Sequence, residues 1–143
     1  MPCPVFILED HDDRYNAIVD AIGRDRIQVD RATTAAEGEW AVSGPHRYCL
    51  ALLDFDLDLD GKVSRDAVGD GSRVVAALAG NHHMKMSVIV HSKNAIGATW
   101  MVCALVAAGR EVAWIPIPTA NRDVQLNLIG RVADRMLCRD HGA

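Results

Sequence analysis

Five short apolar runs alternate with longer stretches of helical periodicity, and this alternation limits the fold more than any other feature of the chain. The apolar runs cover residues 4–8, 27–30, 48–53, 86–90 and 111–115, and the helical stretches cover residues 12–22, 34–42, 70–79, 95–108 and 123–138. Runs that are apolar at nearly every position are typical of parallel strands covered on both faces. Since strand–helix–strand crossovers are right-handed, the pattern predicts an open, doubly wound α/β fold.

We expect one five-stranded parallel sheet of flavodoxin-like topology, with strand order 2-1-3-4-5. The helix ends carry local signals. Gly23 ends the first helix, and Thr34 with Glu37 forms a capping box for the second. Asp12 or Asp13 is expected to cap the first helix. With no repeats and 143 residues, the chain is expected to form one domain spanning residues 1–143.

Two acidic clusters follow the first and third apolar runs directly, at residues 9–13 and 54–60. The predicted strand order places these two strands side by side, and ligands bind at the carboxyl ends of strands in such sheets. Gathered carboxylates repel one another unless a cation joins them or one of them keeps its proton. We therefore expect Glu9, Asp10 and Asp54 to bind Mg²⁺ or Mn²⁺ and, through the metal, a phosphate group.

The second cluster also allows a calcium-loop interpretation. Asp56-x-Asp58-x-Asp60-Gly61 matches the first half of such a loop. The twelfth position would be Ala67, where the loop needs a bidentate glutamate. The preceding segment also has the pattern of a strand and not of an entering helix. The pattern thus favours Asp58 and Asp60 as solvated acids of a loop.

The fourth apolar run ends in polar residues that could take part in chemistry at the same edge of the sheet. His91 could act as a general acid or base, because imidazole titrates near neutral pH. Ser92 could donate a hydrogen bond to a phosphoryl oxygen, and Asn94 could cap the next helix or donate to an oxyanion. The alternative for His91 is a hydrogen-bonded histidine at a strand end with no chemical role.

Other groups could contact phosphate directly. Residues 70–72 open a helix, so the amides around Ser72 offer an anion site as well as a cap. Arg14 lies about one turn into the first helix and could reach the acids or a bound phosphate, or could form only a surface salt bridge. The His82–His83 pair is expected to be inert.

The net charge of −4 gives the chain no general attraction to duplex nucleic acid. No aromatic platform with interleaved basic residues supports single-strand binding. No basic and apolar leader is present, and no uncharged apolar run approaches the roughly 18 residues of a membrane span. We expect a cytoplasmic protein with no membrane partner, whose four cysteines are reduced core thiols and whose three tryptophans are buried or half-buried.

The acid pair Glu9-Asp10, together with Asp54 and Ser92, resembles the site of response-regulator receiver domains over roughly residues 5–136. The resemblance implies that the acid pair holds magnesium and that Asp54 accepts a phosphoryl group from a histidine kinase or a small phosphodonor. It also implies that the Ser92 hydroxyl adjusts to that group.

One part of the receiver pattern is missing. Receivers carry a lysine before a proline after the fifth strand, and this lysine pairs with the phosphoryl group. This chain has Ile115-Pro116 and Ile117-Pro118 there. Lys93 or Arg14 could take the place of the lysine.

Longer motifs are similar to the cyclic-phosphate-processing receiver family. They are residues 8–10 with Arg14, residues 53–57, residues 69–75, and residues 90–97 with Met101. This resemblance implies that the ligand is a phosphate ester or a cyclic phosphodiester. The family often has histidine between the two aspartates, where this chain has Phe55.

Three hypotheses follow. The leading one is metal-dependent binding and hydrolysis of a phosphate ester or cyclic phosphodiester, in which Asp54 or Asp56 attacks or acts as base. His91 would protonate the leaving oxygen, while Ser92 and Asn94 position the phosphate. The alternatives are a signalling receiver phosphorylated on Asp54, and a non-catalytic pseudo-receiver that binds a partner through its fourth helix and fifth strand.

Overall fold

The structure is a computed structural model that describes residues 2–57, 70–81 and 85–140. The elements, in chain order, are β1 (Cys3–Leu8), α1 (Asp12–Ile22), β2 (Ile27–Ala32), α2 (Ala35–Ser43), β3 (Leu50–Leu53), α4 (Ser72–Gly80), β4 (Ser87–Val90), α5 (Ala95–Ala107), β5 (Val112–Trp114) and α6 (Arg122–Asp140). The calcium-loop pattern from Asp58 onward and the His82–His83 pair lie outside the described residues.

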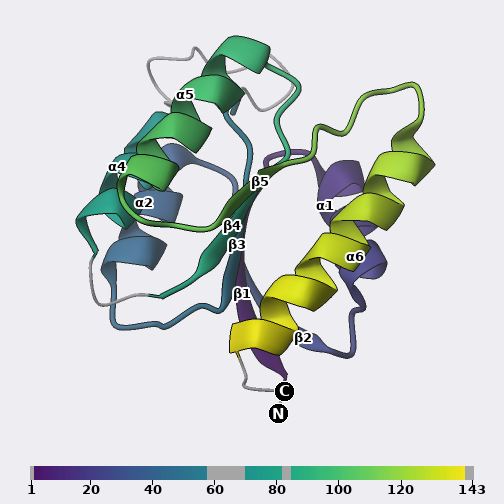
Figure 1. The fold of residues 1–143 in the computed structure, drawn as a ribbon, viewed down its shortest axis with the longest axis horizontal. Helices are drawn as coiled ribbons and strands as arrows, with labels where there is room; N and C mark the ends of the chain where they lie inside the picture. The colour runs from purple at the N-terminus through teal and green to yellow at the C-terminus, as the bar shows by residue number, and fades with distance from the viewer. Residues whose placement is uncertain (1, 58–69, 82–84, 141–143) are drawn as a thin grey trace.

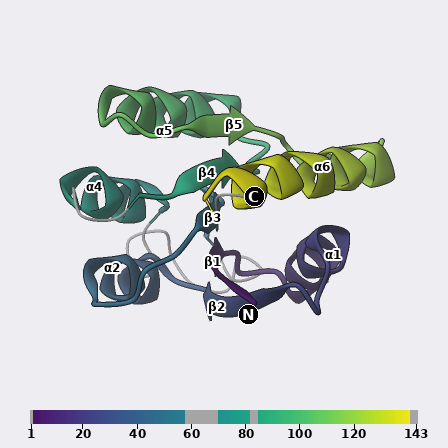
Figure 2. The same cartoon turned by 60° about the horizontal axis from the view of Figure 1, so that its bottom comes forward.

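The five strands form one parallel sheet with the order β2-β1-β3-β4-β5. This arrangement confirms the predicted doubly wound, flavodoxin-like fold. Helices cover both faces of the sheet: α1 and α6 lie on one side, and α2, α4 and α5 lie on the other (Figures 1 and 2). β1 and β3 are neighbours, so the segments that follow them leave the sheet at the same edge.

Two hydrophobic cores hold these layers together, and alternate residues of each strand supply them. On β1, Phe6 and Leu8 face the core beneath α2, α4 and α5, whereas Val5 and Ile7 face the core beneath α1 and α6. All four residues of β3 and of β4 are buried. A strand buried on both faces is apolar at nearly every position, with Ser87 the polar exception in β4, and this is why these runs lacked alternation in the sequence.

The predicted helix signals are largely confirmed. Gly23 ends α1 with φ of 114°, a backbone conformation that favours glycine. The Thr34 hydroxyl oxygen accepts a hydrogen bond from the Glu37 amide at 3.2 Å. The prediction that Asp12 or Asp13 caps α1 was wrong, because the capping position is His11 and both aspartates lie in the first turn. Negative charge in that turn is still favourable to the helix dipole.

Some predicted strand ends differ from the observed ones. β2 continues to Ala32 because β1 pairs with it as far as Leu8. β3 begins only at Leu50, two residues later than expected. Tyr48 is nevertheless buried, and its hydroxyl donates a hydrogen bond to the Asp30 carboxylate at 2.7 Å. Burial and this bond raise the pKa of Tyr48 well above its ordinary value.

The expected burial was wrong for Trp40 and for the cysteines. Trp40 is 76 % exposed, whereas Trp100 and Trp114, at 48 % and 43 % exposure, are about half-buried. The cysteines are free thiols, but Cys3, Cys49, Cys103 and Cys138 are half-buried or exposed and none belongs to the buried core. The physical reason is clearest in α5, which is apolar on all sides, so composition could not show which side meets the sheet.

Helices α1 and α6 pack closely at Gly130, and this contact yields a prediction about stability. A Cβ at position 130 would lie 2.5 Å from the Ala21 carbonyl oxygen, so α6 would have to shift. We expect Gly130→Ala to lower the free energy of unfolding by about 1–3 kcal/mol in urea denaturation. Gly80→Ala is the control, because no atom lies within 4 Å of a Cβ there. Equal stability of the two variants would contradict the close contact.

Candidate functional site

Three buried polar residues extend the central strands at their carboxyl ends. The Glu9 amide donates to Ala32 of β2, the Asp54 amide to Leu8 of β1, and the His91 amide to Leu53 of β3, at 3.0, 3.1 and 3.0 Å. The backbone ladder therefore fixes Glu9, Asp54 and His91 beside one another. All three are almost fully buried, at 0 %, 5 % and 2 % exposure.

Glu9 is the most heavily hydrogen-bonded carboxylate of the site. Its Oε1 accepts from Arg14 Nε at 2.7 Å and lies 3.2 Å from His91 Nε2. Its Oε2 accepts from Arg14 NH2 and from the His11 backbone amide, both at 3.0 Å. Burial alone would raise the pKa of Glu9, but the hydrogen bonds from His91 and Arg14 hold that pKa well below its ordinary value. Glu9 is therefore ionised at every physiological pH.

The other two expected metal ligands lie around the same guanidinium. Arg14 NH2 is 3.3 Å from Asp54 Oδ2 and 3.7 Å from Asp10 Oδ1. The Asp10 side chain is fully buried, and that of Arg14 is 23 % exposed. The structure thus brings Glu9, Asp10 and Asp54 together, and it places Arg14 among them.

Asp54 lies at the centre of the site and is electrostatically strained. Burial is the main cause that raises the pKa of Asp54, and the neighbouring charges of Glu9 and Asp10 add to it, while His91 and Arg14 oppose it. Its Oδ1 accepts a hydrogen bond from the Phe55 amide at 2.8 Å. A carboxylate in such a place favours a proton, a cation or a covalent partner.

Because the Asp54 carboxylate is unfavourably placed in the folded protein, replacing it with a neutral side chain is expected to stabilise the fold. Because the pKa of Asp54 is raised in the folded state, its ionisation destabilises the fold increasingly as the pH rises above 3.8, its value in the unfolded chain. We expect Asp54→Asn to raise the free energy of unfolding at pH 7 by roughly 1 kcal/mol, measured in urea. The gain should shrink toward pH 4, and a variant less stable than wild type at pH 7 would contradict it.

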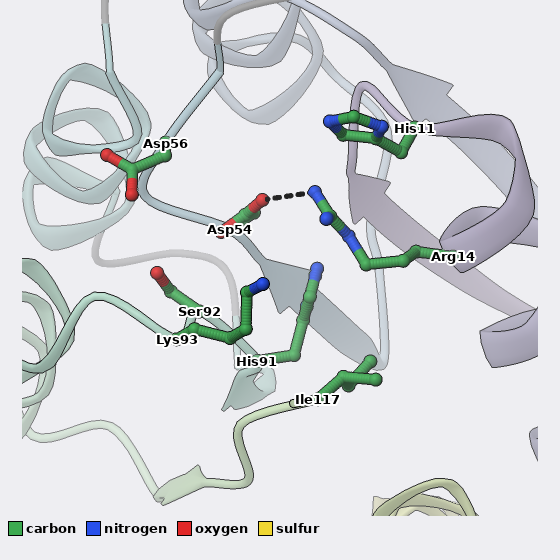
Figure 3. Close-up of a pocket in the computed structure, with 8 residues that line it drawn as sticks. All are labelled: His11, Arg14, Asp54, Asp56, His91, Ser92, Lys93 and Ile117. Carbon is green, nitrogen blue, oxygen red and sulfur yellow. Dashed lines mark hydrogen bonds and ion pairs between the residues drawn. The ribbon is translucent and has the colours of Figure 1, made fainter. Parts of the chain in front are cut away.

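A pocket of about 130 Å³ opens over Asp54. It is lined by His11, Arg14, Asp54, Asp56, His91, Ser92, Lys93 and Ile117 (Figure 3). Pockets for drug-sized ligands are roughly 300–1,000 Å³, so this one suits a phosphoryl-sized group and not a whole nucleotide. The Lys93 side chain turns into the pocket toward Asp54 and His91 (Figure 3).

Residues 92–94 shape the wall formed by the end of β4 and the start of α5. The Asn94 amide donates to Ser92 Oγ at 3.1 Å, and Asn94 Oδ1 accepts from the Gly97 amide at 3.0 Å. Asn94 Nδ2 lies 3.3 Å from both carboxylate oxygens of Asp56. Asn94 therefore caps α5 and holds Asp56. Ser92 is almost fully buried, at 1 % exposure, and lines the pocket.

Ser72 is not brought into the pocket. Its amide donates to Asp70 Oδ1 at 2.9 Å, and its hydroxyl donates to the same oxygen. The Asp70 carboxylate thus takes the position at the start of α4 where an anion was expected.

Two pocket residues, His11 and Ile117, were not predicted from the sequence. His11 directly follows the acid pair, which was the available signal. Ile117 lies between Pro116 and Pro118 after β5, where the receiver pattern has its lysine.

The donor set fits a divalent cation in its chemistry. Oxygen or nitrogen donors of Glu9, Asp54 and His91 lie within 4.8 Å of one another, and all three residues are buried. Carboxylates suit Mg²⁺ and Mn²⁺, and an imidazole nitrogen adds affinity for transition metals. The group that meets this distance is Glu9, Asp54 and His91, and so differs from the expected set of Glu9, Asp10 and Asp54.

No family model matches the chain, and no curated protein matches it. Solved structures do match. A phosphorylated cyanobacterial phytochrome response regulator, RcpA, is 17 % identical with a TM-score of 0.71, over 96 % of this chain and 95 % of that one. A CheY-like receiver domain from Methanospirillum hungatei JF-1 is 20 % identical with a TM-score of 0.59, over 97 % and 99 %. The BeF₃-activated DrrB receiver domain is 14 % identical with a TM-score of 0.62, over 96 % and 98 %.

The fold is therefore that of the CheY-like response-regulator receiver domains. These similarities support the receiver fold and not the narrower cyclic-phosphate-processing family. Within the described ranges, no helix is long and apolar enough to cross a bilayer.

Proposed function

We propose that this chain is a receiver domain that accepts a phosphoryl group on Asp54. The observation that carries the proposal is the position of Asp54: it follows β3, lines a phosphoryl-sized pocket and faces Arg14 and Lys93. Asp56, the neighbouring acid, is held by the Asn94 amide. Asp54 is thus the better placed nucleophile of the two.

The reaction follows from these groups. A carboxylate oxygen of Asp54 attacks the phosphorus of the donor, and an acyl phosphate forms. The leaving atom, an oxygen in acetyl phosphate or a nitrogen in a phosphohistidine, departs with the electron pair of its broken bond to phosphorus. A metal held by Glu9, Asp10 and Asp54 would neutralise the charge on the phosphoryl oxygens. The Ser92 hydroxyl and the Lys93 ammonium would donate to those oxygens, so that Lys93 takes the part of the lysine that is missing near Ile117.

The test is intact-mass spectrometry of the protein incubated with acetyl phosphate and Mg²⁺. We expect a mass increase of one phosphoryl group that depends on the metal and disappears with EDTA. Beryllofluoride, which activates the DrrB receiver domain, is expected to perturb amide resonances around the pocket in the presence of Mg²⁺. No adduct with any of several small phosphodonors, together with no beryllofluoride response, would contradict the proposal.

Hydrolysis of a phosphate ester or cyclic phosphodiester is the second candidate, and His91 favours it. His91 Nδ1 is buried and has no hydrogen-bond partner in the described part of the chain. With Nε2–H donating to Glu9, an imidazolium form of His91 would carry a second proton on Nδ1 that could pass to a leaving oxygen. A water would attack phosphorus and the bond to that oxygen would break. With Mn²⁺ and a panel of cyclic phosphodiesters, His91→Gln should lower turnover by about 100-fold or more. Wild-type turnover no faster than the metal blank would exclude this candidate.

The pseudo-receiver hypothesis predicts a different pattern. A non-catalytic domain would give neither adduct nor turnover, and Asp54→Ala would leave partner binding intact. Loss of partner binding in Asp54→Ala would argue against it.

For the proposed receiver domain, the kinds of partner expected are a histidine kinase, a small phosphodonor or an effector protein.

A further inference from the structure

We infer that Arg14 is the resident cation of the acidic pocket, and that a divalent metal binds by displacing the Arg14 guanidinium from Glu9 and Asp54. This inference rests on the metal binding in the proposed function and adds a competing group that belongs to the chain itself. From the sequence, Arg14 was expected to reach the acids or a bound phosphate, or to form only a surface salt bridge. The structure places it among the acids, where a metal was also expected.

One side chain contacts every carboxylate expected to bind the metal. Arg14 binds Glu9 with two nitrogens, at 2.7 and 3.0 Å, and its NH2 group lies 3.3 Å from Asp54 and 3.7 Å from Asp10. A paired guanidinium neutralises gathered carboxylates just as a metal would. Arg14 therefore offsets part of the negative charge of the three carboxylates without a metal.

Glu9 has no acceptor capacity left for a metal in this arrangement. An ionised carboxylate offers about four lone-pair sites. Glu9 Oε1 faces Arg14 Nε and His91 Nε2, and Oε2 faces Arg14 NH2 and the His11 amide. A metal can therefore reach Glu9 only after one of these donors has left.

Arg14 is the donor best able to leave. The His11 group is a backbone amide, and the His91 side chain is 1 % exposed and fixed at the end of β4. The Arg14 side chain is 23 % exposed, lines the pocket and stands on the first turn of α1, so it can swing toward solvent. A divalent cation and a guanidinium would also repel each other if both stayed among the same carboxylates.

The first test compares Mn²⁺ affinity, measured by calorimetry, in the wild type, Arg14→Met and Lys93→Met. Methionine keeps much of the arginine's length and apolar stem but cannot hold Glu9. Loss of a bidentate charged pair should tighten Mn²⁺ binding by about tenfold or more. Lys93→Met removes the same charge from the pocket, so it controls for net charge and should change the affinity by less than about threefold. Unchanged or weaker binding in Arg14→Met would overturn the inference.

The second test uses the wild-type protein, so it does not depend on how a variant folds. The Arg14 Nε–H, hydrogen-bonded to Glu9, should give a distinct ¹⁵N-resolved resonance without metal. We expect Mg²⁺ to shift or remove this resonance in parallel with saturation of the site. A resonance that stays unchanged at metal saturation would overturn the inference.

These tests separate the inference from the proposed function. If Asp54 forms the phosphoryl adduct but Arg14→Met binds Mn²⁺ no more tightly than the wild type, the inference is rejected and the proposed function stands. Tighter metal binding by Arg14→Met than by the wild type, together with no phosphoryl adduct on the wild type, would support the inference and reject the proposed function. No metal binding in any variant would reject both.

Discussion

Asp54→Asn is expected to abolish phosphoryl uptake from acetyl phosphate. An amide cannot attack phosphorus as a carboxylate does, and none of the other carboxylates among the described residues shares the position of Asp54 in the pocket. Glu9 is occupied by Arg14 and His91, and Asp56 faces the Asn94 amide. We expect the intact-mass adduct to fall below detection, a loss of at least about 100-fold in the rate.

Asp56→Asn is the matched control, because it makes the same chemical change two residues away in the same pocket. It should keep the adduct, with at most a modest change in rate. If Asp56→Asn lost the adduct while Asp54→Asn kept it, the assignment of the acceptor would be wrong.

Glu9→Gln is expected to be the most destabilising single change at the site. The glutamine removes the buried negative charge that Arg14 and His91 face, and leaves these groups and the His11 amide with a poorer acceptor. Breaking a buried charge pair from one side costs several kcal/mol, so we expect a loss of about 3 kcal/mol in the free energy of unfolding at pH 7. Urea denaturation followed by circular dichroism measures it.

The pH dependence of this loss is also defined. The pKa of Glu9 is lowered in the folded state, so its stabilisation is fully present above its ordinary pKa of 4.5 and is lost as the pH falls toward the folded value. The difference between wild type and Glu9→Gln should therefore shrink below pH 4.5. A difference that grew on acidification would contradict this assignment.

Glu39→Gln provides the control for the same substitution on a surface pair. Glu39 is bound to Arg73 at 2.8 Å, but both side chains are about half exposed. Exposed pairs contribute about 0–1 kcal/mol, so this variant should lose far less stability than Glu9→Gln. Similar losses in the two variants would mean that the Glu9 network is no stronger than a surface pair.

Much of the fold could be predicted because burial on both faces requires apolar strands. Residues 5–8 and the strands Leu50–Leu53 and Ser87–Val90 are buried throughout. Right-handed crossovers favour a doubly wound sheet, and the flavodoxin-like strand order then makes these strands neighbours. That adjacency is also what brought Glu9 and Asp54 together. The strand order and the meeting of the acids therefore followed from one pattern.

The sequence allowed Arg14 to reach the acids but gave no reason to prefer this to a phosphate contact or a surface salt bridge. The position of Arg14 depends on how α1 is set against the sheet, and α1 starts at Asp12 without the expected side-chain cap. Ser72 does not line the pocket for a related reason. Its amide and hydroxyl donate to the carboxylate of Asp70, two residues earlier, where an anion was expected to bind. Such outcomes depend on competition between neighbouring groups, which spacing along the chain does not reveal.

The most direct test of the central claim is to locate the phosphoryl group chemically. After incubation with acetyl phosphate and Mg²⁺, borohydride would reduce an aspartyl phosphate to homoserine, and trypsin would release the peptide of residues 48–62. Tandem mass spectrometry of that peptide should place homoserine at position 54. Homoserine at position 56, 58 or 60, or an unmodified peptide from a phosphorylated protein, would contradict the assignment of Asp54 as the acceptor.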